Sequence, residues 1–209
     1  MAVAKEEVGF IFECGRDGPD YKVCRHLLGK LNENIEIVAR FLDNKQRLLS
    51  ECGSISAQLL AACSRVVVIW DLMPPWGTVK PCRQEDKKKA FQSLKDAKVP
   101  DNKVTLICIE QELECWLMAD TRALRAVLSK LKHPHQLSRK LKDYSKPDRQ
   151  IKRPKTELIS LFQRELGNTR KYIDRNHALP LAQEIIDWSK LRRSASFRRF
   201  AEKAAGVKM

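Results

Sequence analysis

Three apolar segments of this sequence each end at an acidic residue, and this recurrence limits the fold more than any other feature does. Residues 8–12 stop at Glu13, residues 65–70 stop at Asp71, and residues 103–109 stop at Glu110. Short apolar runs of this kind are typical of buried parallel strands. A carboxylate placed directly after a buried strand needs a partner for its charge. The sequence therefore predicts strands whose carboxyl ends are functional.

Helical patterns alternate with these strands. Residues 20–31, 45–64 and 85–98 have the amphipathic period of helices, and residues 35–41 add a further strand. This alternation is typical of a parallel sheet with crossover helices, so the predicted fold class is α/β, with a Rossmann-like parallel sheet of about four strands flanked by helices. We expect this core to span residues 1–129, and a basic arm with a helical C-terminal extension to span residues 130–209.

Four finer expectations accompany this fold. Asp20 has the place of an N-cap after a turn built on Gly15, Gly18 and Pro19. The helix over 45–64 is expected to be interrupted near Gly53, and residues 112–128 are expected to form one long helix with an apolar stripe. In the last third of the chain, residues 156–166, 179–191 and 196–205 have the pattern of short amphipathic helices, with Ile186 among the residues expected to face inward.

Parallel strands place all their carboxyl ends at one edge of a sheet, so the strand-end acids are expected to converge. Converging carboxylates repel one another unless a cation neutralises them, and hard divalent cations prefer oxygen ligands. We expect Mg²⁺ or Mn²⁺ as the cofactor. The candidate metal ligands are Glu13, Asp17, Asp20, Asp71, Glu110 and Glu112. Simpler roles are available for three of them, since Asp17 can shape the turn, Asp20 can cap the helix, and Glu112 suits the helix dipole.

The positive charge of the chain is concentrated in its second part. Residues 1–120 hold 17 Lys and Arg against 18 Asp and Glu, whereas residues 121–209 hold 23 against 8. Such an excess is typical of a surface that binds a polyanion, although it can also serve only to solvate helices. The candidate nucleic-acid-binding residues are Arg139, Lys140, Lys142, Lys146, Lys152, Arg153 and Lys155. Aromatic residues are few in this part of the chain, and Tyr144 and Tyr172 are the only candidates for base stacking. We therefore expect binding without sequence readout.

Several other classes of protein fit the sequence poorly. The phosphate-binding loop of NTPases and the Gly-x-Gly-x-x-Gly fingerprint are both absent from it. Its seven cysteines mostly lie in apolar patterns and are expected to be reduced packing residues, with a Cys14 and His26 nucleophile as a minor alternative. Because no segment approaches the roughly 18 apolar residues of a membrane span, we expect a cytoplasmic protein without a membrane partner.

Several motifs together resemble a known family. These are Phe-Glu-Cys-Gly-Arg-Asp-Gly-Pro-Asp over residues 12–20, Val-Ile-Trp-Asp over 68–71, Glu-Leu-Glu-Cys-Trp-Leu-Met-Ala-Asp over 112–120, Arg-Pro-Lys over 153–155 and Ser-Phe over 196–197. In this order they resemble the Toprim-like family called domain of unknown function 4276, which is related to OLD-type Toprim nucleases. The resemblance spans nearly the whole chain. It implies a Toprim-like sheet core and an occurrence among bacterial defence genes, often beside a separate ATPase.

The resemblance also implies roles for individual residues. Glu13 matches the glutamate that serves as acid/base or metal ligand, and Asp17 or Asp20 matches the acid that follows it. Asp71 matches the first acid of an Asp-x-Asp pair, whose second place is held here by Met73. Glu110 or Glu112 is then expected to supply the missing oxygen, or the metal site is degenerate. The candidate catalytic residues are Glu13, Asp71 and Glu112.

Two functions remain open from the sequence. The first is a Mg²⁺-dependent nuclease, or the nuclease subunit of a bacterial anti-phage defence complex, which binds DNA or RNA and hydrolyses phosphodiesters. The second is a catalytically degenerate Toprim-like protein that binds nucleic acid or a partner and works with a separate ATPase. A homo-oligomer is compatible with both.

Overall fold

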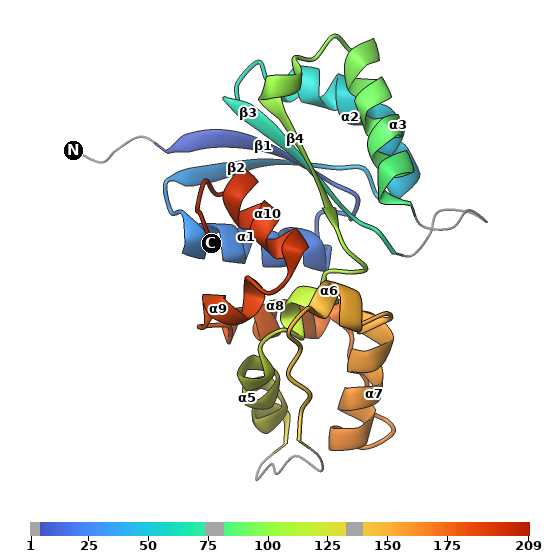
Figure 1. Ribbon diagram of the computed structural model, residues 1–209, viewed down its shortest axis with the longest axis vertical. Coiled ribbons are helices and arrows are strands. Elements are labelled where there is room, and N and C mark those ends of the chain that lie inside the picture. The colour runs from blue at the N-terminus through green and yellow to red at the C-terminus, as the bar shows by residue number, and fades with distance from the viewer. Residues whose placement is uncertain (1–4, 74–81, 133–139) are drawn as a thin grey trace.

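The computed structural model describes residues 5–73, 82–132 and 140–209, and it shows an α/β fold built on a four-stranded parallel sheet (Figure 1). The strands are β1 (Glu6–Phe12), β2 (Ile35–Phe41), β3 (Arg65–Asp71) and β4 (Val104–Ile109). They lie in the order β2-β1-β3-β4, and every neighbouring pair is parallel. The predicted fold class is confirmed.

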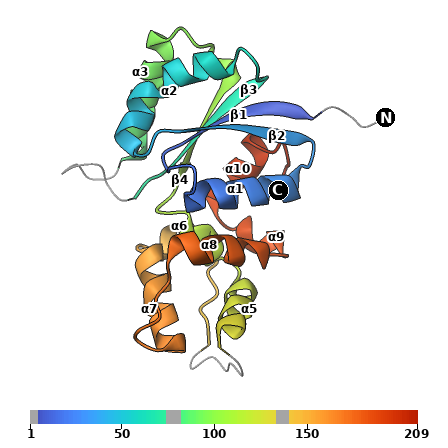
Figure 2. The same cartoon turned by 180° about the vertical axis from the view of Figure 1, so that it is seen from behind.

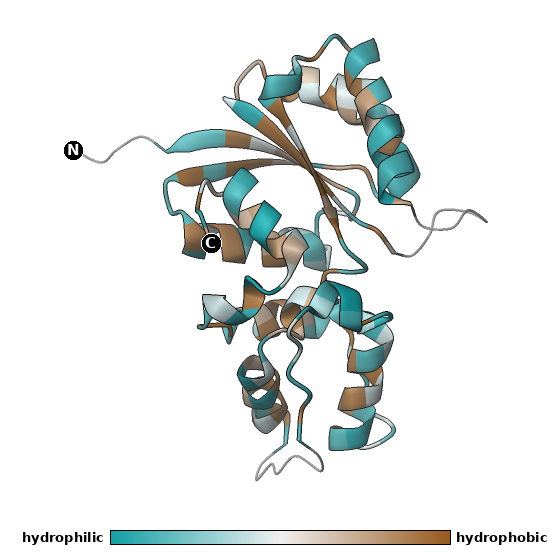
Figure 3. Ribbon diagram, in the orientation of Figure 1, coloured by the Kyte–Doolittle hydropathy of each residue, from teal (hydrophilic) through white to brown (hydrophobic). Residues whose placement is uncertain are grey.

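The residues of each strand alternate between two apolar layers, because successive side chains of a strand point to opposite faces. In β1, Val8, Phe10 and Phe12 belong to one buried cluster, while Ile11 belongs to the other. In β3, Val67 and Ile69 face the first cluster. Figure 3 shows these strands as the apolar centre of the upper part of the molecule. Both faces are covered, which accounts for the nearly continuous apolar runs in the sequence.

Helices cover the two faces unequally. One face is covered by α2 (Lys45–Leu59) and α3 (Arg83–Asp96), which pack against each other. A short 3-10 turn, η1 (Asp101–Lys103), leads into β4. The other face is covered by α1 (Pro19–Leu31) and by the C-terminal helix α10 (Ala195–Lys203), as Figures 1 and 2 show from opposite sides.

The remaining helices form a second group below α1 and α10 in Figure 1. They are α4 (Glu114–Leu117), α5 (Thr121–Leu131), α6 (Pro147–Gln150), α7 (Pro154–Leu166), α8 (Asp174–Gln183) and α9 (Trp188–Leu191). Their buried residues join the apolar cluster of the α1 face, so one core runs from the sheet into this group. α5 contacts α7 and α8. The division of the chain at residues 129 and 130 stays a prediction.

The C-terminal segment is tied back to the sheet by polar contacts. Arg65 donates hydrogen bonds to the carbonyl oxygens of Lys203 and Ala204, at 3.1 and 2.9 Å. Trp116 donates from its indole to the Ser196 hydroxyl at 2.9 Å in a buried position, and its ring packs edge to face on Phe197. These contacts hold α10 and the segment before it in a fixed place beside β4.

Four of the finer sequence expectations are wrong. α2 is continuous through Gly53, where the glycine is needed for packing, because an added Cβ would lie 2.0 Å from the Ser93 carbonyl oxygen on α3. The expected helix over 112–128 is divided into α4 and α5, with Asp120 as the N-cap of α5. The N-cap of α1 is Gly18, which leaves Asp20 inside the first turn. Ile186 is 76% exposed, since α8 ends at Gln183 and α9 begins only at Trp188.

The part of the chain that the structure describes contains no helix with the length and apolar character that crossing a membrane requires. All seven cysteines are free, and five of them are buried, which agrees with their predicted role in packing.

Candidate functional site

The candidate site lies where the strand order reverses. From β1 the chain passes through α1 to β2 on one side, whereas β3 lies on the other side of β1. In open α/β sheets such a switch point leaves a crevice beyond the carboxyl ends of the two strands, and ligands bind there. Glu13 directly follows β1, and Asp71 is the last residue of β3. The predicted convergence of these two acids is therefore a consequence of the observed strand order.

Asp71 is held in place on one side only. Its Oδ2 accepts a hydrogen bond from the Leu113 backbone amide at 3.2 Å, while its Oδ1 is buried without a hydrogen-bond partner among the described residues. Burial raises the pKa of the Asp71 carboxyl well above its usual range, and the charges of Asp20, Glu13 and Glu114 raise it further. Asp71 therefore has an oxygen available for a ligand and an electrostatic need for a cation.

Glu13 has the same character. Its Oε2 is buried and has no hydrogen-bond partner within the ranges that the structure covers. Burial raises the pKa of Glu13 from 4.5 to about 8, and Lys45 opposes this shift while Asp20 adds to it. Lys45 begins α2 and is 8% exposed, and its Nζ donates to the Leu72 carbonyl oxygen at 2.7 Å. This lysine is a member of the site that the sequence did not reveal.

Asp20 joins the two strand-end acids from the first turn of α1. Burial raises the pKa of Asp20 from 3.8 to about 6, whereas a hydrogen bond with Cys14 and the charge of Lys155 lower it. Burial also raises the pKa of the Cys14 thiol to about 12, with Asp20 as the second cause. Because the thiolate is the nucleophilic form, this environment disfavours the alternative nucleophile made of Cys14 and His26.

Glu114 is a fourth buried acid, at the start of α4, and it is 4% exposed. Its Oε1 accepts a hydrogen bond from the Tyr172 hydroxyl at 3.2 Å. Burial raises the pKa of Glu114 to about 7, and Glu112 and Asp20 contribute to the increase. We refer to Glu13, Asp20, Asp71 and Glu114 together as the acid centre.

Lys155 provides positive charge to the acid centre from α7. Its Nζ forms an ion pair with Asp174 Oδ2 at 2.5 Å, and its backbone amide donates to Glu112 Oε2 at 3.1 Å. Burial alone would lower the pKa of Lys155, but the hydrogen bond with Asp174 and the charge of Glu114 raise it. The sequence placed this lysine among the residues of an exposed nucleic-acid-binding arm, whereas the structure places it beside the acids. Glu112, a predicted catalytic residue, holds the start of α7 instead of facing Asp71.

Besides Glu112, two more of the predicted metal ligands lie outside the acid centre. Glu110 follows β4, but its Oε1 is paired with Arg83 Nη1 at 2.6 Å. The side chain of Asp17 is 89% exposed, and its nearest cation is Lys22 at 3.8 Å. Neither acid contributes to the raised pKa values of Glu13, Asp20 or Asp71. The expectation of one cluster of six acids is thus reduced to a smaller group that includes Glu114.

The donor set of the acid centre fits a hard cation in part. Its carboxylates offer only oxygen, and both strand-end acids have an oxygen without a hydrogen-bond partner in the described ranges. Within those ranges, no three His, Cys, Asp or Glu side chains are close enough together to hold an ion by themselves. Mg²⁺ usually takes only one or two carboxylates and completes its shell with water and substrate phosphates. Glu13 and Asp71 therefore suffice for a site of this type.

Most of the predicted nucleic-acid-binding residues are exposed and separate from the acid centre. Arg139 lies outside the described residues. The exposed side chains are those of Lys140, Lys142, Lys146, Lys152 and Arg153. Lys142 lies over the Tyr144 ring, with Nζ 5.1 Å from the ring centre. The two tyrosines proposed for base stacking are wrong for that role, because Tyr144 is 7% exposed and Tyr172 is 2% exposed.

Comparison with known proteins identifies only a family. A family model described as a domain of unknown function (DUF4276) matches residues 21–203. No match was found among the curated proteins or among the solved structures.

Proposed function

We propose that this chain, which belongs to the family described as a domain of unknown function (DUF4276), is a metal-dependent nuclease that hydrolyses phosphodiester bonds. The family description names no activity, so the proposal is drawn from the geometry of the acid centre. The observation that carries this proposal is the pair Glu13 and Asp71 at the switch point of the sheet. Each has a buried carboxylate oxygen without a hydrogen-bond partner in the described chain. Buried carboxylates that repel one another lower the stability of the fold. Groups of this kind, with strongly shifted pKa values, are typical of catalytic and metal-binding sites.

Each acid has a separate role in this proposal. Asp71 Oδ1 and Glu13 Oε2 would hold Mg²⁺ or Mn²⁺, which when bound would activate a water and stabilise charge on the phosphate. Asp20, whose pKa is about 6, is the group that would accept the proton of the attacking water. Glu114, whose pKa of about 7 leaves it partly ionised near neutral pH, accepts the hydrogen bond of Tyr172.

The resemblance to Toprim nucleases supports the same proposal. Glu13 and Asp71 have the places of the Toprim glutamate and of the first acid of Asp-x-Asp. The second acid is replaced by Met73, and we infer that Glu114 compensates as the further buried carboxylate, since its charge raises the pKa of Asp71. We also propose, from the resemblance alone, a role in anti-phage defence beside a separate ATPase, with a DNA or RNA backbone as the substrate.

The experiment compares isosteric variants of the strand-end acids with one of an exposed aspartate. Purified protein is incubated with plasmid DNA or with RNA, in Mg²⁺, in Mn²⁺ and in a chelator. We expect cleavage that needs the metal, and we expect Asp71→Asn and Glu13→Gln to abolish it. Asp17→Asn is the matched control and should cleave as the wild type does, because Asp17 is exposed and outside the acid centre. Equal activity of Asp71→Asn and Asp17→Asn would remove the acid centre from the reaction.

A second function is favoured by one specific observation. Met73 cannot bind a hard cation, and the acids of the described chain do not by themselves form a three-ligand site. If no substrate is cleaved with either metal, we infer a non-catalytic member that binds nucleic acid or a partner through its basic residues. The two functions differ in their response to Asp71→Asn. The substitution abolishes cleavage if the protein is a nuclease, and it leaves nucleic-acid binding unchanged if the acids have no catalytic role.

A further inference from the structure

A cavity lined by basic side chains lies one strand away from the acid centre, and of its lining residues only Glu110 and Lys146 were candidates from the sequence. Its volume is about 450 Å³, within the range of small-ligand sites. It is formed by α6, by the connection from α9 to α10, and by the start of α10. Its cationic residues are Lys146, Arg149, Arg192, Arg193 and Arg198. We call this the arginine cavity.

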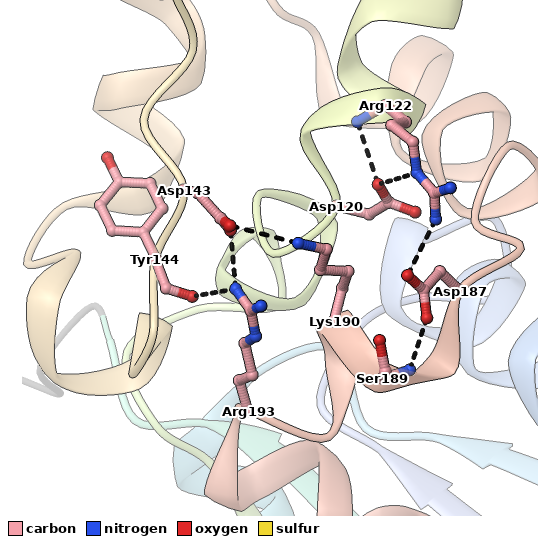
Figure 4. A network of polar contacts seen from close by, with 8 residues as sticks. All are labelled: Asp120, Arg122, Asp143, Tyr144, Asp187, Ser189, Lys190 and Arg193. Carbon is pink, nitrogen blue, oxygen red and sulfur yellow. Dashed lines mark hydrogen bonds and ion pairs between the residues drawn. The ribbon is translucent and has the colours of Figure 1, made fainter.

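The walls of the arginine cavity are held together by hydrogen bonds. Asp148 of α6 is 4% exposed, and its Oδ2 accepts from the amide and the hydroxyl of Ser196, at 2.9 and 3.2 Å. Arg193 donates to Asp143 Oδ1 at 2.7 Å and to the Tyr144 carbonyl oxygen at 3.2 Å, as Figure 4 shows. These contacts join the backbone segments that carry the arginines, and they hold the Arg193 side chain in place.

Arg193 is paired with Asp143, but the other arginines of the arginine cavity are not neutralised by an acid of the described residues. Two acids also line it, but Glu110 is paired with Arg83, and Asp148 is bound to Ser196 with its other oxygen buried. Within residues 5–73, 82–132 and 140–209, the side chains of Arg149, Arg192 and Arg198 make no ion pair or hydrogen bond. Several guanidinium groups without partners in one concave site are suited to phosphate, which they can bind in a bidentate manner.

The excess of positive charge continues beside the cavity. Arg199 follows Arg198 on α10, and its Nη1 is buried without a hydrogen-bond partner in the described chain. Burial lowers the pKa of Lys87, and the charges of Arg199 and Arg83 lower it further. Arg199 and Arg83 therefore repel a further cation beside the cavity.

The arginine cavity is one strand away from the acid centre. Asp71 at the end of β3 is paired in register with Ile109 of β4, and the next residue, Glu110, lines the cavity. Neighbouring strands lie about 4.8 Å apart. A polymer that reaches the acid centre and runs across β4 therefore enters the arginine cavity.

We propose that the arginine cavity binds backbone phosphates of the nucleic-acid strand whose neighbouring phosphodiester lies at the acid centre. The identity of this ligand rests on the function proposed above, whereas the cavity itself does not. It replaces the exposed lysines of the arm as the main phosphate contact. Arg149, Arg192, Arg193 and Arg198 were absent from the residues predicted from sequence, because α6 and α10 lie apart along the chain and only the fold brings them together.

The test compares two double variants in which the same charge is removed. Arg192→Gln with Arg198→Gln removes two cavity cations, and Lys95→Gln with Arg125→Gln removes two exposed cations elsewhere, on α3 and α5. Binding of a labelled single-stranded oligonucleotide is measured by fluorescence anisotropy over a range of salt concentrations. Both double variants carry Glu13→Gln, and a chelator is present, so that cleavage does not interfere. Unchanged thermal melting verifies that each protein is folded. If the cavity double variant does not fold, Arg149→Gln is used in its place.

We expect the cavity variant to bind at least about tenfold more weakly than its parent, which is the factor expected when one charge-assisted hydrogen bond is removed. The slope of log affinity against log salt should fall by about 0.7 for each phosphate that is no longer bound, and the control variant should keep the parent slope. Equally weakened binding in both double variants, or no binding by the parent, would overturn the proposal.

A second arm separates a strand from a small phosphate ligand. Pyrophosphate is titrated in a thermal-melting assay with the parent and the cavity variant. If pyrophosphate stabilises only the parent while oligonucleotide binding is the same in both, the cavity belongs to a small phosphorylated ligand and the strand proposal is wrong. If the wild type does not cleave but its binding depends on the cavity, the proposed hydrolysis fails and the cavity proposal stands.

Discussion

The acid centre and the arginine cavity lie on neighbouring parts of the same sheet edge, but they handle charge in opposite ways. In the acid centre, burial and mutual repulsion raise the pKa values of Glu13, Asp20 and Glu114 to about 8, about 6 and about 7. In the arginine cavity most of the cations are exposed. Ionisation of the first region therefore depends on pH and on a bound cation, whereas binding to the second depends on salt.

This difference follows from where the two regions lie in the fold. Two of the acids follow or end the central strands β1 and β3, and the other two lie at the starts of α1 and α4, where burial raises their pKa values. The arginines project from the ends of α6, α9 and α10, whose buried sides pack on the core. The pair formed by Arg83 and Glu110 separates the two regions, since Glu110 lines the cavity and follows the strand next to Asp71.

The strongest effect that we expect is a loss of stability with rising pH that comes from the acid centre alone. Glu13 has a folded pKa of about 8 against 4.5 in the unfolded chain, so the folded state binds more protons between these pH values. The free energy of unfolding must therefore decrease as pH rises through that window, and a shift of this size corresponds to a few kcal/mol. Asp20 and Glu114 act in the same direction. Urea denaturation at several pH values measures the effect.

Two variants and one ligand make this measurement specific to the acid centre. Glu13→Gln should flatten the pH dependence, and Asp17→Asn should leave it unchanged. Millimolar Mg²⁺ should stabilise the wild type more at high pH than at low pH, because the ion binds the ionised carboxylates. Groups with lowered pKa values, such as Asp143 and Asp187, lose their contribution only at more acidic pH. A wild-type stability that is flat across this window would contradict the description of the acid centre as buried and repulsive.

The next effect is smaller and concerns Lys155. The sequence predicted that this lysine binds nucleic acid, whereas the structure places it beside the acid centre. Its charge lowers the pKa values of Asp20 and Glu114, so Lys155→Met should raise both. If cleavage needs Asp20 ionised, an increase of one unit from its pKa of about 6 lowers the ionised fraction at pH 7 about twofold, and the loss approaches tenfold at lower pH. We expect the pH profile of kcat/KM to shift to higher pH, with activity recovering there. Lys152→Met, three residues earlier and exposed, is the control and should keep the wild-type profile.

The opposite result would assign Lys155 to phosphate binding instead of to the acid centre. If Lys155→Met weakens binding of the oligonucleotide and reduces the salt slope while the pH profile stays in place, then Lys155 contacts phosphate. That was its predicted role from the sequence.

The fold and three of the four residues of the acid centre could be predicted from the sequence, because both depend on local patterns. The four strands and their parallel order follow from apolar runs alternating with helical periods, and β2 and β3 match the predicted bounds. Glu13 and Asp71 follow from strand ends, which any parallel arrangement brings to one edge. The same reasoning could not decide which strand-end acid is neutralised, and Glu110 is paired with an arginine from α3 that gave no signal.

The rest of the site depends on how helices distant in sequence pack on the sheet. Glu114 was not among the candidate residues from the sequence, and its hydrogen-bond partner Tyr172 is 58 residues away. Lys45 looked like the ordinary first residue of a helix. The expected helix over 112–128 begins only at Glu114, and Leu113, the N-cap of α4, donates its backbone amide to Asp71. A sequence pattern records periodicity, and it does not record which buried polar group meets which partner.

The weakest effect that we expect tests the border between the two regions. Glu110→Gln removes a carboxylate that pairs with Arg83 and lines the arginine cavity. Because both side chains are partly exposed, the free energy of unfolding should change by no more than about 1 kcal/mol. Removal of a negative charge from a phosphate site should strengthen oligonucleotide binding by a factor of about two to five at low salt, and the gain should disappear as salt rises. Anisotropy titrations at two salt concentrations measure this.

The control for Glu110 is Glu33→Gln, an exposed glutamate in the turn between α1 and β2, at the opposite edge of the sheet. It should leave oligonucleotide binding unchanged, because it lies far from both regions. If Glu110→Gln abolishes metal-dependent cleavage while the protein stays folded, Glu110 belongs to the acid centre as the sequence predicted, and its pairing with Arg83 must open when substrate binds. In that case the two regions share a residue, and the border drawn between them is wrong.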